Sequence, residues 1–275
     1  METDILTIQA LTKSFSRKIM NSDGGEDDEQ YWIIKDLFLN VPRGKVIALI
    51  GGNGAGKTTL FNIISGFVKP DSGSIIFKGD GCESELLKMQ PHLIAQMGLG
   101  RMFQDNHIFG EMSVLDNMLI ANSLNSSENP VSALLFKKRL KRDEVKRTEK
   151  TAQIFDTFFG KESPFWEKRY VPAGTLSYGQ QRLLGLARLF MREYQLLLLD
   201  EPSSGVNPEV IEQIKVLIRR FTEQNQTVLL IEHNLDVVQD IADFCCYMDQ
   251  GRITLMGTPA DVIGNEDVRK SYVGF

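Results

Sequence analysis

The sequence contains no apolar run of the roughly 18 residues that a membrane-spanning helix needs. Residues 1–15 are charged and amphipathic, and they lack the apolar centre of a secretory signal. Only three cysteines are present, two adjacent and one alone, so the chain has neither a disulfide framework nor the spacing of a cysteine metal site. We therefore expect the chain to stay in the cytosol.

The net charge of -5 over 275 residues lacks the positive balance of a dedicated nucleic-acid binder, and we expect no nucleic-acid partner. Hydrophobic residues make up 42% and charged residues 24%, ordinary values for a soluble globular protein with a proper core. Basic residues nevertheless crowd segment 137–150, interleaved with acidic ones. They form either a solvated helix face or a contact for anionic lipid headgroups or an acidic partner.

Short strands alternate with helices over much of the chain. The pattern predicts strands at 46–50, 74–78, 196–199 and 227–231, and helices at 57–65, 208–221 and 235–241. This alternation is typical of the α/β fold class, in which a parallel sheet is covered by helices on both faces.

Two segments depart from this alternation. Residues 5–10 and 32–41 are predicted to pair as a hairpin, with a solvated acidic loop at 21–30 between them. A functional acidic loop is the alternative. The pattern from 114 to 159 is helical, with a polar break at 122–130, which predicts a helical insertion into the α/β domain.

The first chemical motif follows the predicted strand 46–50 and opens a helix. It has the pattern G-x-x-x-x-G-K-[ST] and consists of Gly51, Gly52, Asn53, Gly54, Ala55, Gly56, Lys57 and Thr58. Glycines let the backbone bend so that its N–H groups point at phosphate oxygens, and the helix N-terminus adds a partial positive charge. Lys57 can reach the β- and γ-phosphates, and the Thr58 hydroxyl can bind Mg²⁺. The motif, extended to Thr59, predicts an ATP phosphate site.

The second motif is a strand of four leucines that ends in two carboxylates, Asp200 and Glu201. Ligands of open parallel sheets sit beyond the carboxyl ends of the strands. We therefore expect Asp200 to lie beside Thr58 and to hold Mg²⁺, directly or through water. Glu201 would then face the γ-phosphate and polarise an attacking water as a general base.

The third motif, Leu176-Ser177-Tyr178-Gly179-Gln180-Gln181, stands at the start of a predicted helix. Ser and Gly at a helix N-terminus form an anion site, although a serine there is by itself usually only a cap. With this motif placed before the Asp200 strand, the sequence resembles the ATP-binding cassette (ABC) family. That family carries a phosphate loop, a Gln loop, an LSGGQ signature, an acidic strand and a His loop in this order.

The remaining family positions have counterparts here. Gln104, in Arg101-Met102-Phe103-Gln104, resembles the Gln-loop residue that senses the γ-phosphate through Mg²⁺ or water. His233, in Ile231-Glu232-His233, resembles the switch histidine that orients the γ-phosphate and the general base. Phe15 resembles the aromatic residue that stacks on adenine, and Tyr31 and Trp32 are rival stacking partners.

The resemblance implies an ATPase with ATP and Mg²⁺ as cofactors. It implies a P-loop NTPase fold of the RecA-like kind, with an N-terminal antiparallel β subdomain. Residues 1–104 and 175–275 would form the ATP-binding core, and 105–174 the helical subdomain. By resemblance, Glu201, His233, Lys57 and Gln104 are catalytic, Thr58, Gln104 and Asp200 hold the metal, and Ser177, Gly179 and Gln180 contact ATP.

Three residues differ from the usual family pattern. Tyr178 replaces the first glycine of the signature, but phosphate contacts would come from Ser177 and Gly179. Gly52 stands where proline is common, which loosens the turn. Asn207 replaces the usual aspartate of the D-loop, which puts an ionic contact across a dimer in doubt.

The closer likeness is to the ATPase subunits of branched-chain amino acid importers. The ATPase subunits of urea and short-amide importers are very similar to these. The alternatives are a lipopolysaccharide-export ATPase and an ABC ATPase that moves no solute. An importer subunit would bind transmembrane permease subunits and a second ATPase subunit, the same or related, packed head to tail. It would serve a substrate-binding protein indirectly and would lie peripherally on the inner face of the plasma membrane.

Three apolar residues follow the Gln loop closely. Ile108, Phe109 and Met112 either line a groove for a short cytoplasmic helix of the permease or pack inside the helical subdomain. The first alternative predicts that ATP arrival at Gln104 shifts the helical subdomain and the docked permease together.

Overall fold

The computed structural model describes residues 4–20, 26–79, 81–105, 107–121, 145, 148–149, 151–155 and 167–273. All the basic residues of segment 137–150 lie outside these described residues, as do residues 21–25 of the predicted acidic loop. The chain divides into two compact units, each described below by itself. The first comprises Met1–Arg101, Gln195–Ser204 and Ile218–Phe275, and the second Met102–Tyr194 and Gly205–Leu217.

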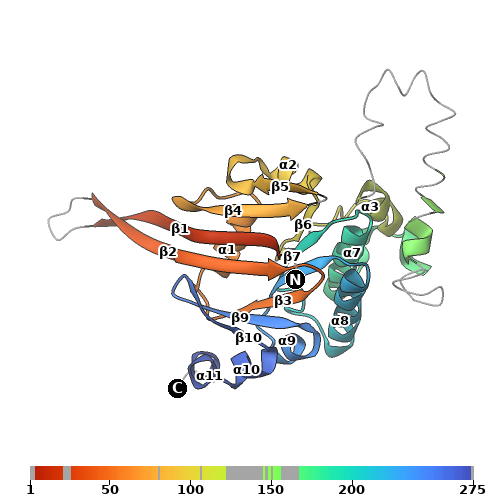
Figure 1. Ribbon diagram of the computed structural model, residues 1–275. Helices are drawn as coiled ribbons and strands as arrows, with labels where there is room; N and C mark the ends of the chain where they lie inside the picture. Colours follow the sequence, from red (N-terminus) through yellow and green to blue (C-terminus); the bar gives the residue numbers. More distant parts are fainter. Residues whose placement is uncertain are drawn as a thin grey trace, which may run out of the picture. The chain divides into compact units, whose positions relative to one another are not determined.

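A six-stranded sheet has the strand order β10-β9-β3-β8-β7-β6 (Figure 1). Its strands are β3 (Val46–Ile50), β6 (Leu99–Met102), β7 (Leu196–Asp200), β8 (Thr227–Ile231), β9 (Phe244–Asp249) and β10 (Arg252–Gly257). Strand β3 is parallel to β8 and β9, and β7 is parallel to β8. Strand β10 adds an antiparallel edge to the predicted parallel core.

Alternate residues of the strands face opposite sides of this sheet. Ile47 and Leu49 of β3 pack in one core with Phe61 of helix α1 (Lys57–Ile64). Ala48 and Ile50 pack in a second core with Val238. That residue belongs to α9 (Leu235–Ile241), and α10 (Pro259–Gly264) and α11 (Glu266–Val273) border the same core. The sheet is thus covered on both faces, as the α/β prediction requires.

The antiparallel sheet predicted near the N-terminus has the order β2-β1-β4-β5. Its strands are β1 (Asp4–Met20), β2 (Glu26–Pro42), β4 (Ser72–Gly79) and β5 (Cys82–Glu85), followed by the 3-10 turn η1 (Leu86–Lys88) and helix α2 (Pro91–Gln96). The pairing of β1 with β4 ends at Thr12, whereas its pairing with β2 continues to Met20. Beyond the sheet, β1 and β2 therefore form a two-stranded ribbon, visible at the left of Figure 1.

This ribbon corrects the predicted loop at 21–30, because Glu26–Gln30 belong to a strand. Two acidic residues of β2 lie opposite basic residues of β1: Arg17 pairs with Glu29 at 3.1 Å, and Lys18 lies opposite Asp28. Cross-strand pairs of opposite charge stabilise such a ladder. A composition that cannot build a core can therefore still form a strand when its partner strand complements its charge.

The second unit contains helices α3 (Val114–Ala121) and α7 (Tyr178–Phe190) and the 3-10 turns η3 (Lys168–Tyr170) and η4 (Ala173–Thr175). Helix α3 matches the start of the predicted helical middle and ends where the polar break was expected. Helix α8 (Pro208–Glu223) begins in the second unit and ends in the first. The boundaries of the functional subdomains, 104/105 and 174/175, stay a prediction. Among the described residues no helix is long and apolar enough to cross a bilayer.

Candidate nucleotide-binding site

The Gly-rich loop joins the buried strand β3 to helix α1. Gly51 and Gly56 have positive φ angles, 153° and 104°. A Cβ on Gly51 would lie 2.1 Å from the carbonyl oxygen of Met248, and one on Gly56 would lie 2.8 Å from that of Ile33. Only glycine fits both places, so the loop can curl tightly into the first turn of α1, whose N–H groups have no partner within the helix. At Gly52, in contrast, a Cβ would meet nothing within 4 Å, so the departure from proline there is easily accommodated.

Lys57 is the buried cation of this loop, with 6% of its surface exposed. Its Nζ donates hydrogen bonds to the carbonyl oxygens of Gly51 at 2.7 Å and Gly52 at 2.9 Å. Burial lowers the pKa of Lys57, and the carboxylates of Glu201 and Asp200 act in the opposite direction. The ammonium group is therefore held inside the phosphate loop, where a bound anion would stabilise its charged form.

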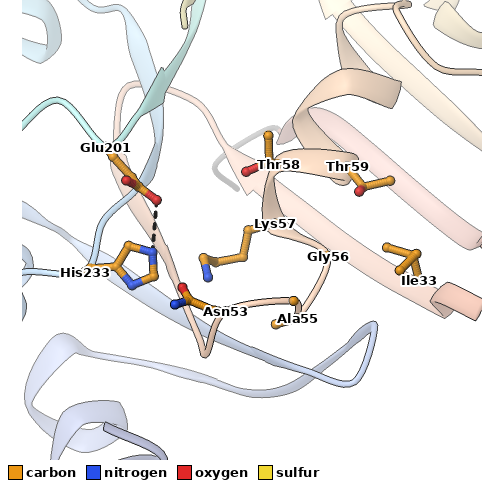
Figure 2. Close-up of a pocket in the computed structure, with 10 residues that line it drawn as sticks. Ile33, Asn53, Ala55, Gly56, Lys57, Thr58, Thr59, Glu201 and His233 are labelled. Atoms are coloured by element: carbon orange, nitrogen blue, oxygen red, sulfur yellow. Dashed lines mark ion pairs between the residues drawn. The ribbon is translucent and has the colours of Figure 1, made fainter. Parts of the chain in front are cut away.

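Glu201 and His233 follow neighbouring parallel strands, β7 and β8. Their side chains meet, with Glu201 Oε1 3.0 Å from His233 Nε2. Figure 2 shows the Lys57 side chain directed toward the side of the pocket where this pair lies. Glu201 has a φ of 48°, a left-handed conformation that non-glycine residues adopt at a cost of roughly 1–3 kcal/mol. The surrounding loop therefore holds this side chain in place against a local conformational preference.

These residues border one open pocket of about 190 Å³. Its lining consists of Ile33, Asn53, Gly54, Ala55, Gly56, Lys57, Thr58, Thr59, Glu201 and His233. The pocket thus brings together the phosphate loop, the expected general base and the expected switch histidine. Ile33 also lines the pocket, although it belongs to none of the sequence motifs.

Asp200 ends β7 and is 1% exposed. Arg101 Nη2 lies 3.5 Å from its Oδ2, and Arg101 Nη1 donates to Ser65 Oγ at 2.7 Å. Burial raises the pKa of Asp200, and the Arg101 guanidinium opposes that shift. The second oxygen, Oδ1, is buried and accepts no hydrogen bond from the described residues. Arg101 is therefore a counter-ion for Asp200, a role that its place in the Gln-loop motif did not predict.

This donor set fits a magnesium ion of the kind that nucleotides carry. A buried carboxylate oxygen without a partner is a suitable ligand, and the Thr58 hydroxyl is exposed beside the loop. Among the described residues no three His, Cys, Asp or Glu side chains gather as a metal cage. Mg²⁺ commonly binds through one or two protein groups and takes its other ligands from phosphates and water.

The candidate adenine-stacking residues lie on the ribbon of β1 and β2. Phe15 and Tyr31 are cross-strand partners with ring centroids 6.3 Å apart, and both rings are partly exposed. Lys13 Nζ lies 5.0 Å from the Phe15 centroid. Trp32 pairs instead with Ser14. Since successive strand residues alternate in direction, Trp32 lies on the opposite face, and only Phe15 and Tyr31 can act together.

In the second unit, Ser177 caps helix α7 through a capping box. Its Oγ accepts from the Gln180 backbone N–H at 3.3 Å, and Gln180 Oε1 accepts from the Ser177 N–H at 3.1 Å. A Cβ on Gly179 would lie 3.0 Å from Val210 Cγ2, so glycine is favoured there. Tyr178 is 47% exposed, and the Arg182 guanidinium lies 5.3 Å from its ring. The tyrosine thus replaces glycine without burying its ring.

Asn207 and Gln104 also lie in the second unit. Asn207 Oδ1 accepts from the Val210 N–H at 2.9 Å, so this residue serves as a helix cap for α8. Gln104 is exposed, and the neighbouring Phe103 carbonyl accepts a hydrogen bond from buried Arg182 at 3.2 Å. Arg182 therefore connects the start of the signature helix to the Gln loop within this unit.

Glu232 is a further buried carboxylate near the site, and none of the sequence motifs assigns it a role. Glu232 is 2% exposed and accepts three backbone hydrogen bonds, from Ser203, His233 and Asn234. A carboxylate directly after an apolar strand was the available signal, the same one that identified Asp200 and Glu201.

Comparison with known proteins gives consistent matches. A family model described as ABC transporter matches residues 34–204. The chain is 38% identical over 242 residues to the high-affinity branched-chain amino acid transport ATP-binding protein BraF of Pseudomonas aeruginosa, covering 88% of this chain and 91% of that protein. It is 34% identical, with the same coverage, to the correspondingly described LivG of Escherichia coli (strain K12). It also resembles the ADP conformation of MJ1267, an ATP-binding cassette of an ABC transporter, with a TM-score of 0.76, 26% identity, and coverage of 99% of this chain and 100% of that one.

Proposed function

This chain belongs to the ABC transporter family, as an ATP-binding subunit and ATPase, and we propose that it powers the import of branched-chain amino acids or a similar small polar solute such as urea or a short amide. Support for the substrate class comes from the printed descriptions of the relatives BraF and LivG. The observation that carries the proposed chemistry is the pair Glu201–His233, 3.0 Å apart in the pocket that Lys57 borders.

In the proposed cycle, the phosphates of ATP are bound by backbone N–H groups of residues 51–59, which form the Gly-rich loop and the first turn of α1. Lys57 exchanges its two carbonyl acceptors for oxygens of the β- and γ-phosphates. Glu201 accepts a hydrogen bond from the attacking water and polarises it. His233 orients Glu201 and the γ-phosphate, and its contact with Glu201 supports that role.

Mg²⁺ would be held by Asp200, Thr58 and Gln104 together with phosphate oxygens. The ion would supply positive charge to the phosphate oxygens as negative charge develops during cleavage. The partnerless Asp200 oxygen supports this assignment. Phe15, with Tyr31 beside it, would stack on the adenine ring.

A second ATPase subunit, identical or related, would complete the site. A single phosphate loop leaves the γ-phosphate open on one side, and a capped helix N-terminus is a suitable group to close it. In the proposed head-to-tail pair, Ser177, Gly179 and Gln180 of one subunit meet the ATP bound by Lys57 of the other. The capping box at Ser177 supports this role, because it fixes the start of α7.

The permease would dock on the surface around Phe109 and Met112. Both side chains are partly exposed, 48% and 38% respectively, which favours the groove alternative over packing inside the described part of the second unit. Their backbone is held by Asn117, which is fully buried, accepts from the Phe109 N–H at 2.9 Å and donates to the Phe109 carbonyl at 2.9 Å. A rigid turn with outward apolar side chains suits a groove for a short permease helix, and such docking would attach the chain to the membrane from outside the bilayer.

Solute uptake tests the proposal. Cells lacking the gene should lose energy-dependent uptake of labelled leucine, and wild-type protein but not Glu201→Gln should restore it. Labelled urea and acetamide serve as parallel substrates, and loss of either one in place of leucine would reassign the solute within the same proposal. Unchanged uptake of all three would overturn the importer assignment and favour an exporter or an ABC ATPase without a solute.

A further inference from the structure

We propose that Glu232 is a positioning residue that locks the loop carrying Glu201 to the loop carrying His233, so that the two side chains act as one unit. The inference rests on the proposed roles of Glu201 and His233 in hydrolysis. Glu232 itself contacts backbone groups of the two loops and touches no reacting atom. It would act only through the residues that it holds.

The two oxygens of Glu232 serve different loops. Oε1 accepts from the Ser203 N–H at 3.1 Å, in the loop that follows β7. Oε2 accepts from the N–H groups of His233 at 2.9 Å and Asn234 at 3.1 Å, in the loop that follows β8. Across the part of the chain that the structure describes, these three amides account for the carboxylate's hydrogen bonds.

A buried carboxylate is well suited to this bridging role. It offers only acceptors, and bonds from N–H groups to an ionised oxygen are roughly twice as strong as those between neutral groups. Burying such a charge is costly unless its lone pairs are satisfied, and Glu232 is 2% exposed. The carboxylate and the three amides therefore stabilise one another, and neither loop can move without breaking charge-assisted bonds.

The locked loops are those that carry the proposed chemistry. Glu201 lies two residues before Ser203, and His233 directly follows Glu232. A second tie runs from the Glu201 N–H to the Ile231 carbonyl at 3.0 Å. Glu201 also keeps a left-handed φ of 48°, which its surroundings must maintain. A shift of about one ångström between the loops would separate the 3.0 Å contact of Glu201 with His233 and can cost about 10²-fold in rate.

The variant Glu232→Gln keeps the size of the side chain but replaces one oxygen with an NH₂ donor. That donor must face either the Ser203 amide or the amides of His233 and Asn234, so one loop is released. We expect kcat for ATP hydrolysis to fall by about 10- to 100-fold. The dissociation constant for ATP should stay within about twofold, because the phosphate loop keeps all its contacts.

A matched control is Glu85→Gln. Glu85 also accepts backbone N–H groups, in this case two on its Oε1, from Ile75 at 3.0 Å and Leu87 at 3.4 Å, but it lies in the antiparallel sheet. The same chemical change there should leave kcat unaltered. If Glu232→Gln does not fold, Glu232→Asp repeats the test, because it keeps both oxygens and the charge but is one methylene too short to bridge the loops.

Two readouts separate positioning from general destabilisation. In a Glu201→Gln background, Glu232→Gln should reduce kcat by less than about threefold, since the residue through which it acts is already disabled. The ring signals of His233, one of only three histidines, should shift in the nuclear magnetic resonance spectrum of Glu232→Gln and not in that of Glu85→Gln.

The possible failures are distinguishable. If Glu201→Gln abolishes turnover while folded Glu232→Gln keeps its kcat and the His233 signals unshifted, the positioning role is wrong and the proposed function stands. If Glu201→Gln itself keeps full turnover, the proposed chemistry is wrong. The His233 signals then still decide whether Glu232 holds the loops.

Discussion

Lys57 and Glu201 show how single residues divide binding from chemistry in this pocket. Lys57 is already engaged with two backbone carbonyls, so an arriving phosphate replaces neutral acceptors with anionic ones. Burial lowers the pKa of Lys57, and a phosphate beside it would favour its charged form. The interaction of Lys57 with the phosphates therefore contributes to the affinity for ATP. Glu201 pairs with His233 and faces the pocket, where it can act on water only after ATP is bound.

This division predicts opposite kinetic behaviour for two variants. Glu201→Gln should bind ATP as wild type does but hydrolyse it about 10²–10⁴-fold more slowly, the usual range for losing a general base. Lys57→Ala should weaken ATP binding roughly 10- to 100-fold, because a charge-assisted contact is lost. Fluorescent-nucleotide titration and phosphate release measure the two quantities. His233→Ala should lose turnover as well, and equal turnover in wild type and Glu201→Gln would remove Glu201 from the mechanism.

At the scale of secondary structure elements, the outer ribbon of β1 and β2 extends beyond the four-stranded sheet. Beyond Thr12, β1 pairs only with β2, and two-stranded ribbons are marginally stable by themselves. The ion pair of Arg17 with Glu29 is largely exposed, and such pairs contribute about 0–1 kcal/mol. The outer ribbon should therefore matter little to the stability of the domain.

Shortening the ribbon tests this interpretation and the adenine assignment together. Ser16 and Gln30 are paired in register, so an Asn-Gly turn can join them in place of residues 17–29. We expect the melting temperature to change by less than about 3 °C and ATP turnover to be unaltered, since every pocket-lining residue remains. The contrasting variant, Phe15→Ala in the full-length chain, should raise the KM for ATP. Lost turnover in a stable shortened protein would instead show that the acidic segment has a function.

Sequence patterns predicted some elements well and others badly for identifiable reasons. Strands β3 and β8 and helix α9 have the bounds that were expected, because each has a clear apolar pattern; in addition, Gly51 follows β3 and Asn234 caps the start of α9. The outer ribbon was predicted as a loop, because charge pairing between strands cannot be inferred until the partner strand is known. The chemistry of Asp200 and Glu201 followed from their place after β7, whereas the partnership of Glu232 with Ser203 depends on residues 29 positions apart.

At the scale of the whole molecule, the proposed transporter requires two ATPase subunits around each ATP. Blocking hydrolysis should trap that assembly, so Glu201→Gln should double its mass from 31.0 kDa in the presence of ATP, as measured by light scattering. Lys57→Ala is the control, since it should bind ATP too weakly to dimerise. A Glu201→Gln protein that stays monomeric in ATP, and does not join a related ATPase subunit either, would contradict the head-to-tail arrangement.

The proposed permease contact would attach the ATPase subunit to the membrane. Substituting Phe109 and Met112 with serine removes exposed apolar surface, while Asn117 continues to hold the backbone of the turn. Because burial of two such side chains supplies roughly 3–6 kcal/mol, we expect the double variant to separate from the permease on co-purification and to leave membranes. Its ATPase activity without the permease should equal that of wild type.

The matched control for this loss is Phe38→Ser, which removes an aromatic side chain of 57% exposure from strand β2 and should leave co-purification intact. If the folded double variant still co-purifies with the permease, the docking surface lies elsewhere. The basic segment 137–150 is then the next surface to change, by substituting its lysines with glutamine. An apolar groove predicts attachment that survives high salt, whereas attachment through that basic segment should weaken as salt screens its charges.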